Sequence, residues 1–240
     1  MLPRRPLAAL LDPRTGQWLG ADSRRRFLQG IGAVGATGLL APGAFAEMLT
    51  QTPRQTEGPF YPDHLPRDTD NDLLIINDAI TPSVGQVTHV SGRVLGPSGA
   101  PVRNALVEIW QADAHGVYLH SGSAGGERRD GNFQGYGRFL TNAKGEYYFR
   151  TIRPVPYPGR TPHIHFAISR GDRRLLTTQM YVKGEQQNER DGVLRGIRDA
   201  QQRESVLVDL QPLPDSPIEE LAGEFNIVLG TTPSDPVRES

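Results

Sequence analysis

The chain has 240 residues, of which 27 are glycine, 20 are proline and 37% are hydrophobic, a composition that favours one turn-rich domain with few long helices. Its formal net charge of −1 gives no support to nucleic-acid binding. Because the chain contains no cysteine, disulfides, zinc–thiolate sites and cysteine nucleophiles are excluded.

Residues 1–46 have the pattern of an export signal. Arg24 and Arg25 precede an uncharged stretch, Phe27 to Ala46, which ends in the small-x-small sequence Ala44-Phe45-Ala46, and such a series is typical of secretory signals. The paired arginines followed by Phe and Leu resemble the twin-arginine signal. We therefore expect the twin-arginine export machinery as a partner, cleavage after Ala46 and a periplasmic or extracellular location. The alternative is a retained membrane anchor, because the uncharged stretch is 20 residues long, although five glycines and a proline weaken it as a helix.

Residues 47–87 predict an irregular N-terminal arm. Its segment "QTEGPFYPDHLPRDTDND" (55–72) is rich in proline and aspartate and follows neither a helical nor a strand period. We expect this arm to contribute to a pocket on the domain that follows.

Residues 88–240 alternate short β-like runs with turn residues. We expect strands within 88–95, 104–112, 137–152, 162–169, 175–182, 204–211 and 223–230. The segment 137–152 predicts a hairpin with Asn142 to Gly145 at the turn, and "RGDRR" (170–174) predicts a second hairpin. Residues 188–202 predict a short helix. This spacing favours a mainly β fold, a β-sandwich of the immunoglobulin or transthyretin-like kind, with long loops.

The strand "PHIHFAIS" (162–169) carries two histidines one strand repeat apart. Side chains alternate between the faces of a strand, so His163 and His165 are expected on one face and Ile164, Phe166 and Ile168 in the core. Two imidazoles on one face can reach a common metal ion. A His-x-His pair is more often only a polar strand face, and the pair alone does not decide between these interpretations.

The other histidines narrow the choice of metal site. None of the six follows His165 in the chain, whereas a hydrolase barrel built around His-x-His would need ligands downstream and far more helix. A cupin-type site with three histidines would have to take its third histidine from upstream.

Several segments within about residues 51–185 resemble the intradiol ring-cleavage dioxygenases, the catechol and protocatechuate 3,4-dioxygenase type. They are "TEGPFYP" (56–62), "GAPVRNALVEIWQADAHGVY" (99–118), "FQGYGRFLTNAKGEYYFRTIRPVPYP" (133–158), "PHIHF" (162–166) and "TQMYVKG" (178–184). The resemblance implies a sandwich of the dioxygenase type and one non-haem Fe(III) ion per chain. By motif position, the iron ligands would be Tyr118, Tyr157, His163 and His165. Such a set suits ferric iron, a hard ion that prefers anionic oxygen donors to thiolates.

The same resemblance implies a reaction and further roles. A catechol-type substrate would be cleaved by O2 between its two hydroxylated carbons, to give a cis,cis-muconate-type product. Tyr157 would be ligand and base in turn, Arg160 would stabilise negative charge on the ring, and Gln179 would lie near the oxygen site. Thr56 and Pro59 would line the pocket. Relatives dimerise or pair with a second subunit, so a homo-oligomer is one of the assemblies that the resemblance implies.

One departure from the family and several alternatives stay open. The gap between Tyr157 and His163 is shorter than in well-known members, so the substrate is left open among catechol, protocatechuate, hydroxyquinol and substituted catechols. Arg160 could be a solvated loop cation, and Gln179 a polar strand residue. The segment "VSGRVLGPSGAPVRNALVEIW" (90–110) also looks like non-catalytic transthyretin-like binding modules. Another sandwich-borne metalloenzyme would use histidines and carboxylates without tyrosinates.

Overall fold

The structure, a computed structural model of the chain, describes residues 10–11, 18–19, 48–77, 80–231 and 233. The chain divides into two units, Met1–Ala46 and Glu47–Ser240. In the first unit, β1 (Leu10–Leu11) and β2 (Trp18–Leu19) form an antiparallel pair. Within the predicted export signal, the paired Arg24 and Arg25, the uncharged stretch and the cleavage site at Ala46 lie outside the described residues. Within the described parts of the chain, no helix has the length and apolar character needed to cross a bilayer.

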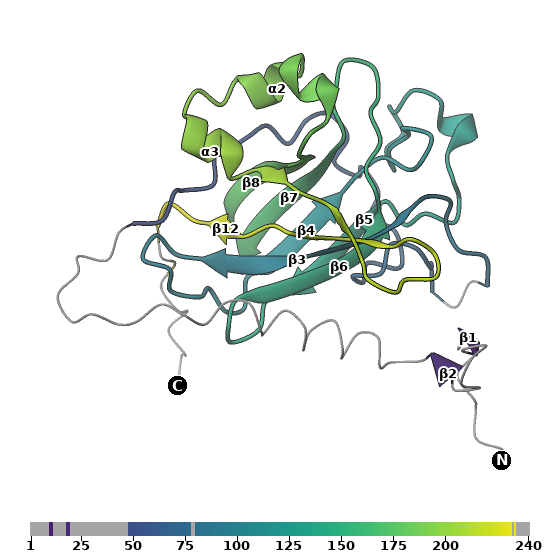
Figure 1. The fold of residues 1–240 in the computed structure, drawn as a ribbon, viewed down its shortest axis with the longest axis horizontal. Helices are drawn as coiled ribbons and strands as arrows, with labels where there is room; N and C mark the ends of the chain where they lie inside the picture. The colour runs from purple at the N-terminus through teal and green to yellow at the C-terminus, as the bar shows by residue number, and fades with distance from the viewer. Residues whose placement is uncertain (1–9, 12–17, 20–47, 78–79, 232, 234–240) are drawn as a thin grey trace. The chain divides into compact units, whose positions relative to one another are not determined.

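The second unit is built on two five-stranded sheets (Figure 1). The first sheet, here the site sheet, has the order β5 (Tyr136–Leu140), β4 (Leu106–Trp110), β7 (His163–Arg170), β8 (Arg173–Val182) and β9 (Leu207–Val208). The second has β10 (Gln211–Pro212), β11 (Leu221–Glu224), β3 (Val87–Leu95) and β12 (Ile227–Val228), with β6 (Glu146–Ile152) on the other edge of β3. The predicted β-sandwich is thus confirmed.

The core lies between the two sheets. Val90 of β3 and Phe149 of β6 pack in one apolar cluster with Ile109, Ile164 and Phe166 of the site sheet, and all five are fully buried. Burying a side chain of this kind stabilises the fold by about 1.5–3 kcal/mol. This core therefore fixes the position of the site sheet. The face of the site sheet that is turned away from the core is left for function.

β7 is buried on both faces. Ile164, Phe166 and Ile168 belong to the core, whereas His163 and His165 lie on the opposite face, so the predicted alternation is confirmed. That second face is covered by the arm and by loops. Neither helix nor strand occurs in the described arm residues 48–77 and 80–86.

The predicted hairpin over 137–152 is wrong. The turn does close at the expected place, because the Gly145 N–H donates to the Asn142 carbonyl at 2.9 Å. The strands on its two sides separate, however: β5 pairs with β4, and β6 pairs with β3 in the other sheet. Turn residues indicate where a chain reverses, and the partner of each strand is decided by the rest of the sandwich. The second predicted hairpin, β7 with β8, is confirmed.

The segment after β8 breaks into short pieces instead of one helix. A 3-10 turn (η3, Gln186–Glu189) precedes two helices, α2 (Gly192–Arg195) and α3 (Ala200–Glu204); another 3-10 turn, η2 (Gly126–Arg128), lies in the loop before β5. Asp191 caps α2, and Asp199 caps α3. Each aspartate accepts backbone N–H groups that the first turn leaves unpaired, so the two helices start independently.

Candidate metal centre

Strand register aligns the candidate residues on the outer face of the site sheet. His165 of β7 lies opposite Trp110 of β4 and opposite Gln179 of β8, and His163 lies opposite Tyr181. Directly paired residues point to the same face of a sheet. The sheet itself therefore gathers two imidazoles, an amide and a phenol in neighbouring rows.

Three of the four predicted iron ligands meet at one point. The His163 and His165 Nε2 atoms are 3.2 Å apart, and the Tyr118 hydroxyl is 3.2 Å from the same His163 nitrogen. The three residues are 2% exposed. The Thr161 carbonyl lies 2.6 Å from His163 Nδ1. Because a carbonyl only accepts, Nδ1 carries the proton, and a lone pair at Nε2 faces the cluster.

The fourth predicted ligand, Tyr157, comes from a tight turn. The Arg160 N–H donates to the Tyr157 carbonyl at 2.9 Å, and Gly159 between them has φ +82°. Pro158 followed by a glycine with positive φ is the sequence of a type II turn. The Tyr157 ring lies 5.6 Å from the Tyr118 ring and 5.5 Å from the His163 ring, centroid to centroid. The short gap to His163 thus consists largely of one turn, which keeps Tyr157 beside the other three.

The arm covers this cluster. Gly58 has φ +73°, and a Cβ at this position would lie 3.5 Å from His165 Cε1. Phe60 stacks on Tyr118 with ring centroids 5.1 Å apart and meets Tyr157 edge-on at 6.5 Å. Two apolar or backbone groups of the arm therefore lie directly against the predicted ligands.

The two predicted lining residues of the arm have different places. The Thr56 carbonyl accepts a hydrogen bond from Gln179 Nε2 at 3.0 Å, and its hydroxyl accepts one from Gly58 N. Pro59 is exposed, between Gly58 and Phe60. The predicted lining role stays a prediction for both.

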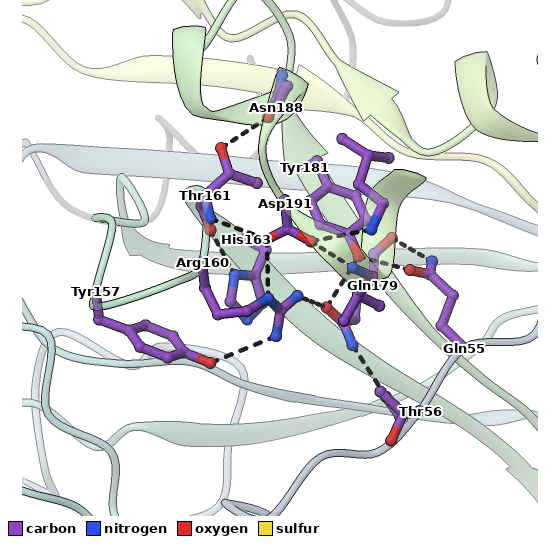
Figure 2. A network of polar contacts seen from close by, with 12 residues as sticks. Gln55, Thr56, Tyr157, Arg160, Thr161, His163, Gln179, Tyr181, Asn188 and Asp191 are labelled. Carbon is purple, nitrogen blue, oxygen red and sulfur yellow. Dashed lines mark hydrogen bonds and ion pairs between the residues drawn. The ribbon is translucent and has the colours of Figure 1, made fainter. Parts of the chain in front are cut away.

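Arg160 and Gln179 lie side by side at the edge of the cluster (Figure 2). One Arg160 nitrogen donates to Gln179 Oε1, and another lies 3.4 Å from the Tyr157 hydroxyl. Arg160 Nε also forms an ion pair with Asp191 at 2.8 Å. Arg160 therefore has two buried partners, Gln179 and Asp191, which disagrees with its interpretation as a solvated loop cation.

The electrostatics suit a bound cation. Burial, together with the neighbouring Tyr157, raises the pKa of Tyr118 well above its usual value, so a phenolate forms there only when a cation stabilises it. Burial and the Arg160 charge lower the pKa of His163 to about 4. Burial and His163 lower that of His165 as well. Both imidazoles are neutral at pH 7, the state in which histidine binds a metal.

Comparisons with known proteins agree with this arrangement. A family model described as "Dioxygenase" matches residues 56–231. The chain belongs to the intradiol ring-cleavage dioxygenase family. It is 43% identical over 126 residues to the protocatechuate 3,4-dioxygenase beta chain of Burkholderia cepacia, a match that covers 49% of this chain and 53% of that protein. It is 31% identical over 219 residues to catechol 1,2-dioxygenase 2 of Acinetobacter lwoffii, covering 75% of this chain and 76% of that one.

Solved structures of intradiol dioxygenases share the fold. The dioxygenase domain of a dioxygenase carbohydrate-binding protein fusion from Streptomyces sp. SirexAA-E superposes with a TM-score of 0.58 at 31% identity, covering 76% of this chain and 99% of that domain. The chain spans only 53% and 61% of the first two curated relatives that it matches.

The rival interpretations lose support in this intradiol family member. A non-catalytic module would not need two phenols and two imidazoles gathered at one place, three of them buried. Among the described residues, no group of three or more histidine, cysteine, aspartate or glutamate side chains could hold a metal ion. A histidine-and-carboxylate site of another metalloenzyme class therefore finds no counterpart in that part of the chain.

Sequence reasoning missed three residues of the polar network. The Tyr181 hydroxyl donates to Gln55 Oε1 at 2.6 Å and also lies 3.0 Å from Gln179 Oε1. Asp191 forms the ion pair with Arg160. Strand period two, counted from Gln179, could have placed Tyr181 on the same face. Asp191 precedes an apolar run and could have been predicted as a helix cap, but nothing local links it to Arg160.

Proposed function

We propose that the protein is a non-haem Fe(III) intradiol dioxygenase, which cleaves a catechol-type ring between its two hydroxylated carbons with O2 and gives a cis,cis-muconate-type product. The observation that carries this proposal is the convergence of Tyr118, Tyr157, His163 and His165 under the arm. Membership of the family supports the same reaction.

The residues present fit a ferric ion. Two phenol oxygens and two neutral imidazoles form a hard, partly anionic donor set, and the raised pKa of Tyr118 leaves this phenol in need of a cation. We therefore propose Tyr118, Tyr157, His163 and His165 as ligands of one iron per chain. The chemistry that a bound Fe(III) would supply is Lewis acidity toward the substrate hydroxyls and activation of the ring toward O2.

The chain's own residues would bind the substrate and move its protons. Tyr157 is only partly buried and lies beside the Arg160 guanidinium, so its oxygen is placed to accept a proton from a substrate hydroxyl. Arg160 presents a fixed positive charge that stabilises negative charge on the ring. The Gln179 amide, fixed by Thr56 and Arg160, would contact the substrate or O2. Phe60 and Gly58, which lie against Tyr118 and His165, would shield these two ligands from water.

The short turn from Tyr157 to His163 motivates a proposal on specificity. It leaves little chain to close over the substrate, so we propose a pocket that accepts substituted catechols as well as catechol, protocatechuate and hydroxyquinol. Comparable kcat/KM values on catechol, protocatechuate and hydroxyquinol would support this breadth. Activity confined strictly to catechol would contradict it.

A visible spectrum tests the function itself. Phenolate bound to Fe(III) gives a charge-transfer band, so the iron-loaded protein is expected to be red to burgundy and to change colour when a catechol is added without O2. With O2, uptake and a ring-opened diacid are expected. A colourless protein that contains iron would rule out the tyrosinate site.

We also propose that the chain is exported. The Arg24-Arg25 pair and the Ala44-Phe45-Ala46 sequence motivate this proposal, with the twin-arginine machinery as partner and a periplasmic or extracellular location. N-terminal sequencing of the protein from the expressing cell should begin at Glu47. An intact leader would favour the membrane-anchor alternative.

A homo-oligomer, which the family resemblance allows, is checked by light scattering on the same sample.

A further inference from the structure

Asp191 is a buried carboxylate between η3 and α2. It is 1% exposed. One oxygen accepts the Val193 and Leu194 N–H groups at 2.9 Å each and caps α2. The other accepts Arg160 Nε at 2.8 Å and the Thr161 N–H at 3.0 Å. An ionised carboxylate has about four acceptor positions, so all of them are used.

The second oxygen has no part in capping the helix. Asp199 caps α3 with a single bond to the Gln202 N–H at 2.8 Å, and no ion pair or other side-chain bond of Asp199 is found within the described residues. A helix cap therefore does not require the bonds that Asp191 Oδ2 accepts from Arg160 and Thr161. Its two bonds run to consecutive residues of the Tyr157–His163 segment, which carries the candidate site.

The Arg160 guanidinium is held from two directions (Figure 2). Its Nε meets Asp191, one terminal nitrogen donates to Gln179, and the other lies near the Tyr157 hydroxyl. Charge-assisted bonds of this kind are shorter and stronger than neutral ones. The planar guanidinium can satisfy all three contacts in one orientation only. Without Asp191, Gln179 would be the one remaining partner that holds the guanidinium. Rotation about the Arg160 side-chain bonds would then carry Nη1 away from the Tyr157 hydroxyl.

Gln179 is itself fixed, so it cannot follow a displaced Arg160. Its Nε2 donates to the Thr56 carbonyl at 3.0 Å, and its Oε1 also faces the Tyr181 hydroxyl. Asn188, in the same segment as Asp191, accepts from the Thr161 hydroxyl at 2.7 Å. Thr161 in turn holds His163 through its carbonyl. The segment after β8 therefore supports the site at two successive residues.

We propose that Asp191 is a positioning residue, which holds the Arg160 guanidinium beside Tyr157 and Gln179 in the orientation that the substrate meets. The inference rests on the proposed function, because it assigns to Arg160 a charge that acts on the substrate. Its chemistry is electrostatic, and Asp191 itself touches neither substrate nor metal ligand.

Asp191→Asn is the main test. Asparagine keeps one oxygen for the α2 cap, whereas its amide cannot accept from Arg160 or Thr161. We expect kcat/KM for catechol to fall by about 10- to 100-fold, mainly in kcat, because misplacing a group by about 1 Å can cost about 100-fold. The visible band is expected to shift, because Arg160 lies beside Tyr157. Asp199→Asn is the matched control, and it should stay within about twofold of wild type. Equal effects of the two variants would overturn the proposal.

A double variant separates positioning of Arg160 from damage to the fold. Arg160→Gln combined with Asp191→Asn places two neutral amides where the ion pair was, so no buried charge is left unpaired. If Asp191 acts through Arg160, adding Asp191→Asn to Arg160→Gln should lower kcat/KM by less than about twofold. A further loss of tenfold or more would overturn the proposal, even if Asp191→Asn alone proved too unstable to measure.

Crystal structures of the metal-free proteins give a result that does not depend on turnover. In the Asp191→Asn protein the guanidinium should leave the Tyr157 hydroxyl, whereas in the Asp199→Asn protein it should stay. An unmoved guanidinium would overturn the positioning role. Failure of the proposed function looks different: the wild type would be colourless and inactive on every catechol, whatever the position of Arg160.

Discussion

At the residue scale, the four candidate ligands differ in how firmly the protein holds them. His163 is oriented by the Thr161 carbonyl at 2.6 Å, and His165 by stacking on Trp110, with ring centroids 4.8 Å apart and planes within 10°. Tyr157 is the one candidate ligand that is partly exposed, and it meets its neighbours through ring contacts, a hydrogen bond with Tyr118 and the long approach of Arg160 at 3.4 Å. The loosest of the four is thus the one to which the proposed mechanism gives a second task, accepting a proton.

Tyr157→Phe tests this second task. The variant keeps the ring against Phe60 and Tyr118 and loses the oxygen. We expect kcat to fall by about 10²- to 10⁴-fold, the usual contribution of a general base, together with a changed visible spectrum. Tyr148→Phe is the control, because Tyr148 lies in the other sheet and bonds to His89. It should leave kcat within about twofold of wild type and the visible spectrum unchanged. Normal turnover by Tyr157→Phe would exclude the base.

His163→Ala tests the metal site by removing a donor. Its Nε2 lies 3.2 Å from both His165 Nε2 and the Tyr118 oxygen, so its loss opens the middle of the cluster. The purified variant should contain less than about a tenth of the wild-type iron, because the loss of even a hydrogen-bond partner of a ligand costs about 10- to 100-fold in metal affinity. His120→Ala removes a partly exposed histidine of the neighbouring loop and should bind iron as the wild type does. Retention of iron by His163→Ala, measured by elemental analysis, would count against the ligand set.

At the scale of elements, one carboxylate joins the arm to the site sheet. Glu108 of β4 accepts the Tyr61 hydroxyl at 2.9 Å and the Tyr136 hydroxyl at 2.6 Å, and its other oxygen pairs with Arg174 at 3.2 Å. The Tyr61 ring meets Trp110 edge-on at 5.0 Å. The arm is therefore fixed next to the histidine that Trp110 orients, although its described residues form neither helix nor strand.

Tyr61→Phe should loosen the arm selectively. The change keeps the ring on Trp110 but removes a hydrogen bond to a buried carboxylate, at a cost of about 1.5–3 kcal/mol. Hydrogen exchange of residues 48–65 should quicken, while β4 and β7 stay protected. Tyr136→Phe deletes the other donor to the same oxygen from within β5. That control should lower overall stability without a selective change in the arm. Equal protection of the arm in both variants would refute the anchoring role.

Local sequence patterns predicted correctly those features that depend only on residues close in sequence. Strand alternation placed His163 and His165 opposite Ile164 and Phe166, and the structure confirms it. The rules failed where partners are distant in sequence. The separation of β5 from β6 depends on β3 and β4, and the pairing of Asp191 with Arg160 spans 31 residues. Tyr118 could be named only through a family resemblance, because a loop and not a period brings it to the histidines.

At the scale of the whole molecule, the second sheet carries a polar cluster that is separate from the candidate metal centre. His89 of β3 lies between the Tyr148 hydroxyl at 2.6 Å and Glu220 at 3.2 Å. Arg150 and Asp72 also face it and form an ion pair with each other at 3.1 Å. Burial lowers the pKa of His89, and the Glu220 carboxylate opposes this only in part. His89 is therefore neutral in the folded protein at pH 7.

The lowered pKa of His89 makes stability depend on pH with a definite sign. An unfolded histidine titrates near pH 6.5, about its model value, so on acidification the unfolded chain takes up this proton before the folded one. The contribution is complete above about pH 7 and is lost as the pH falls through 6.5, by at most about 1.4 kcal/mol per pH unit for one proton. It stops changing once the pH is below the folded pKa.

His89→Gln isolates this contribution from those of the other titrating groups. Glutamine can still donate to Glu220 and accept from Tyr148, and it does not titrate, so the stability advantage of wild type over the variant should shrink between pH 7.5 and pH 5.5. Urea unfolding of both proteins at equal iron content measures the difference. A constant difference would mean that the His89 pKa does not change on folding. A difference that grows on acidification would mean that the Glu220 carboxylate outweighs burial, which raises the folded pKa above 6.5 and reverses the sign.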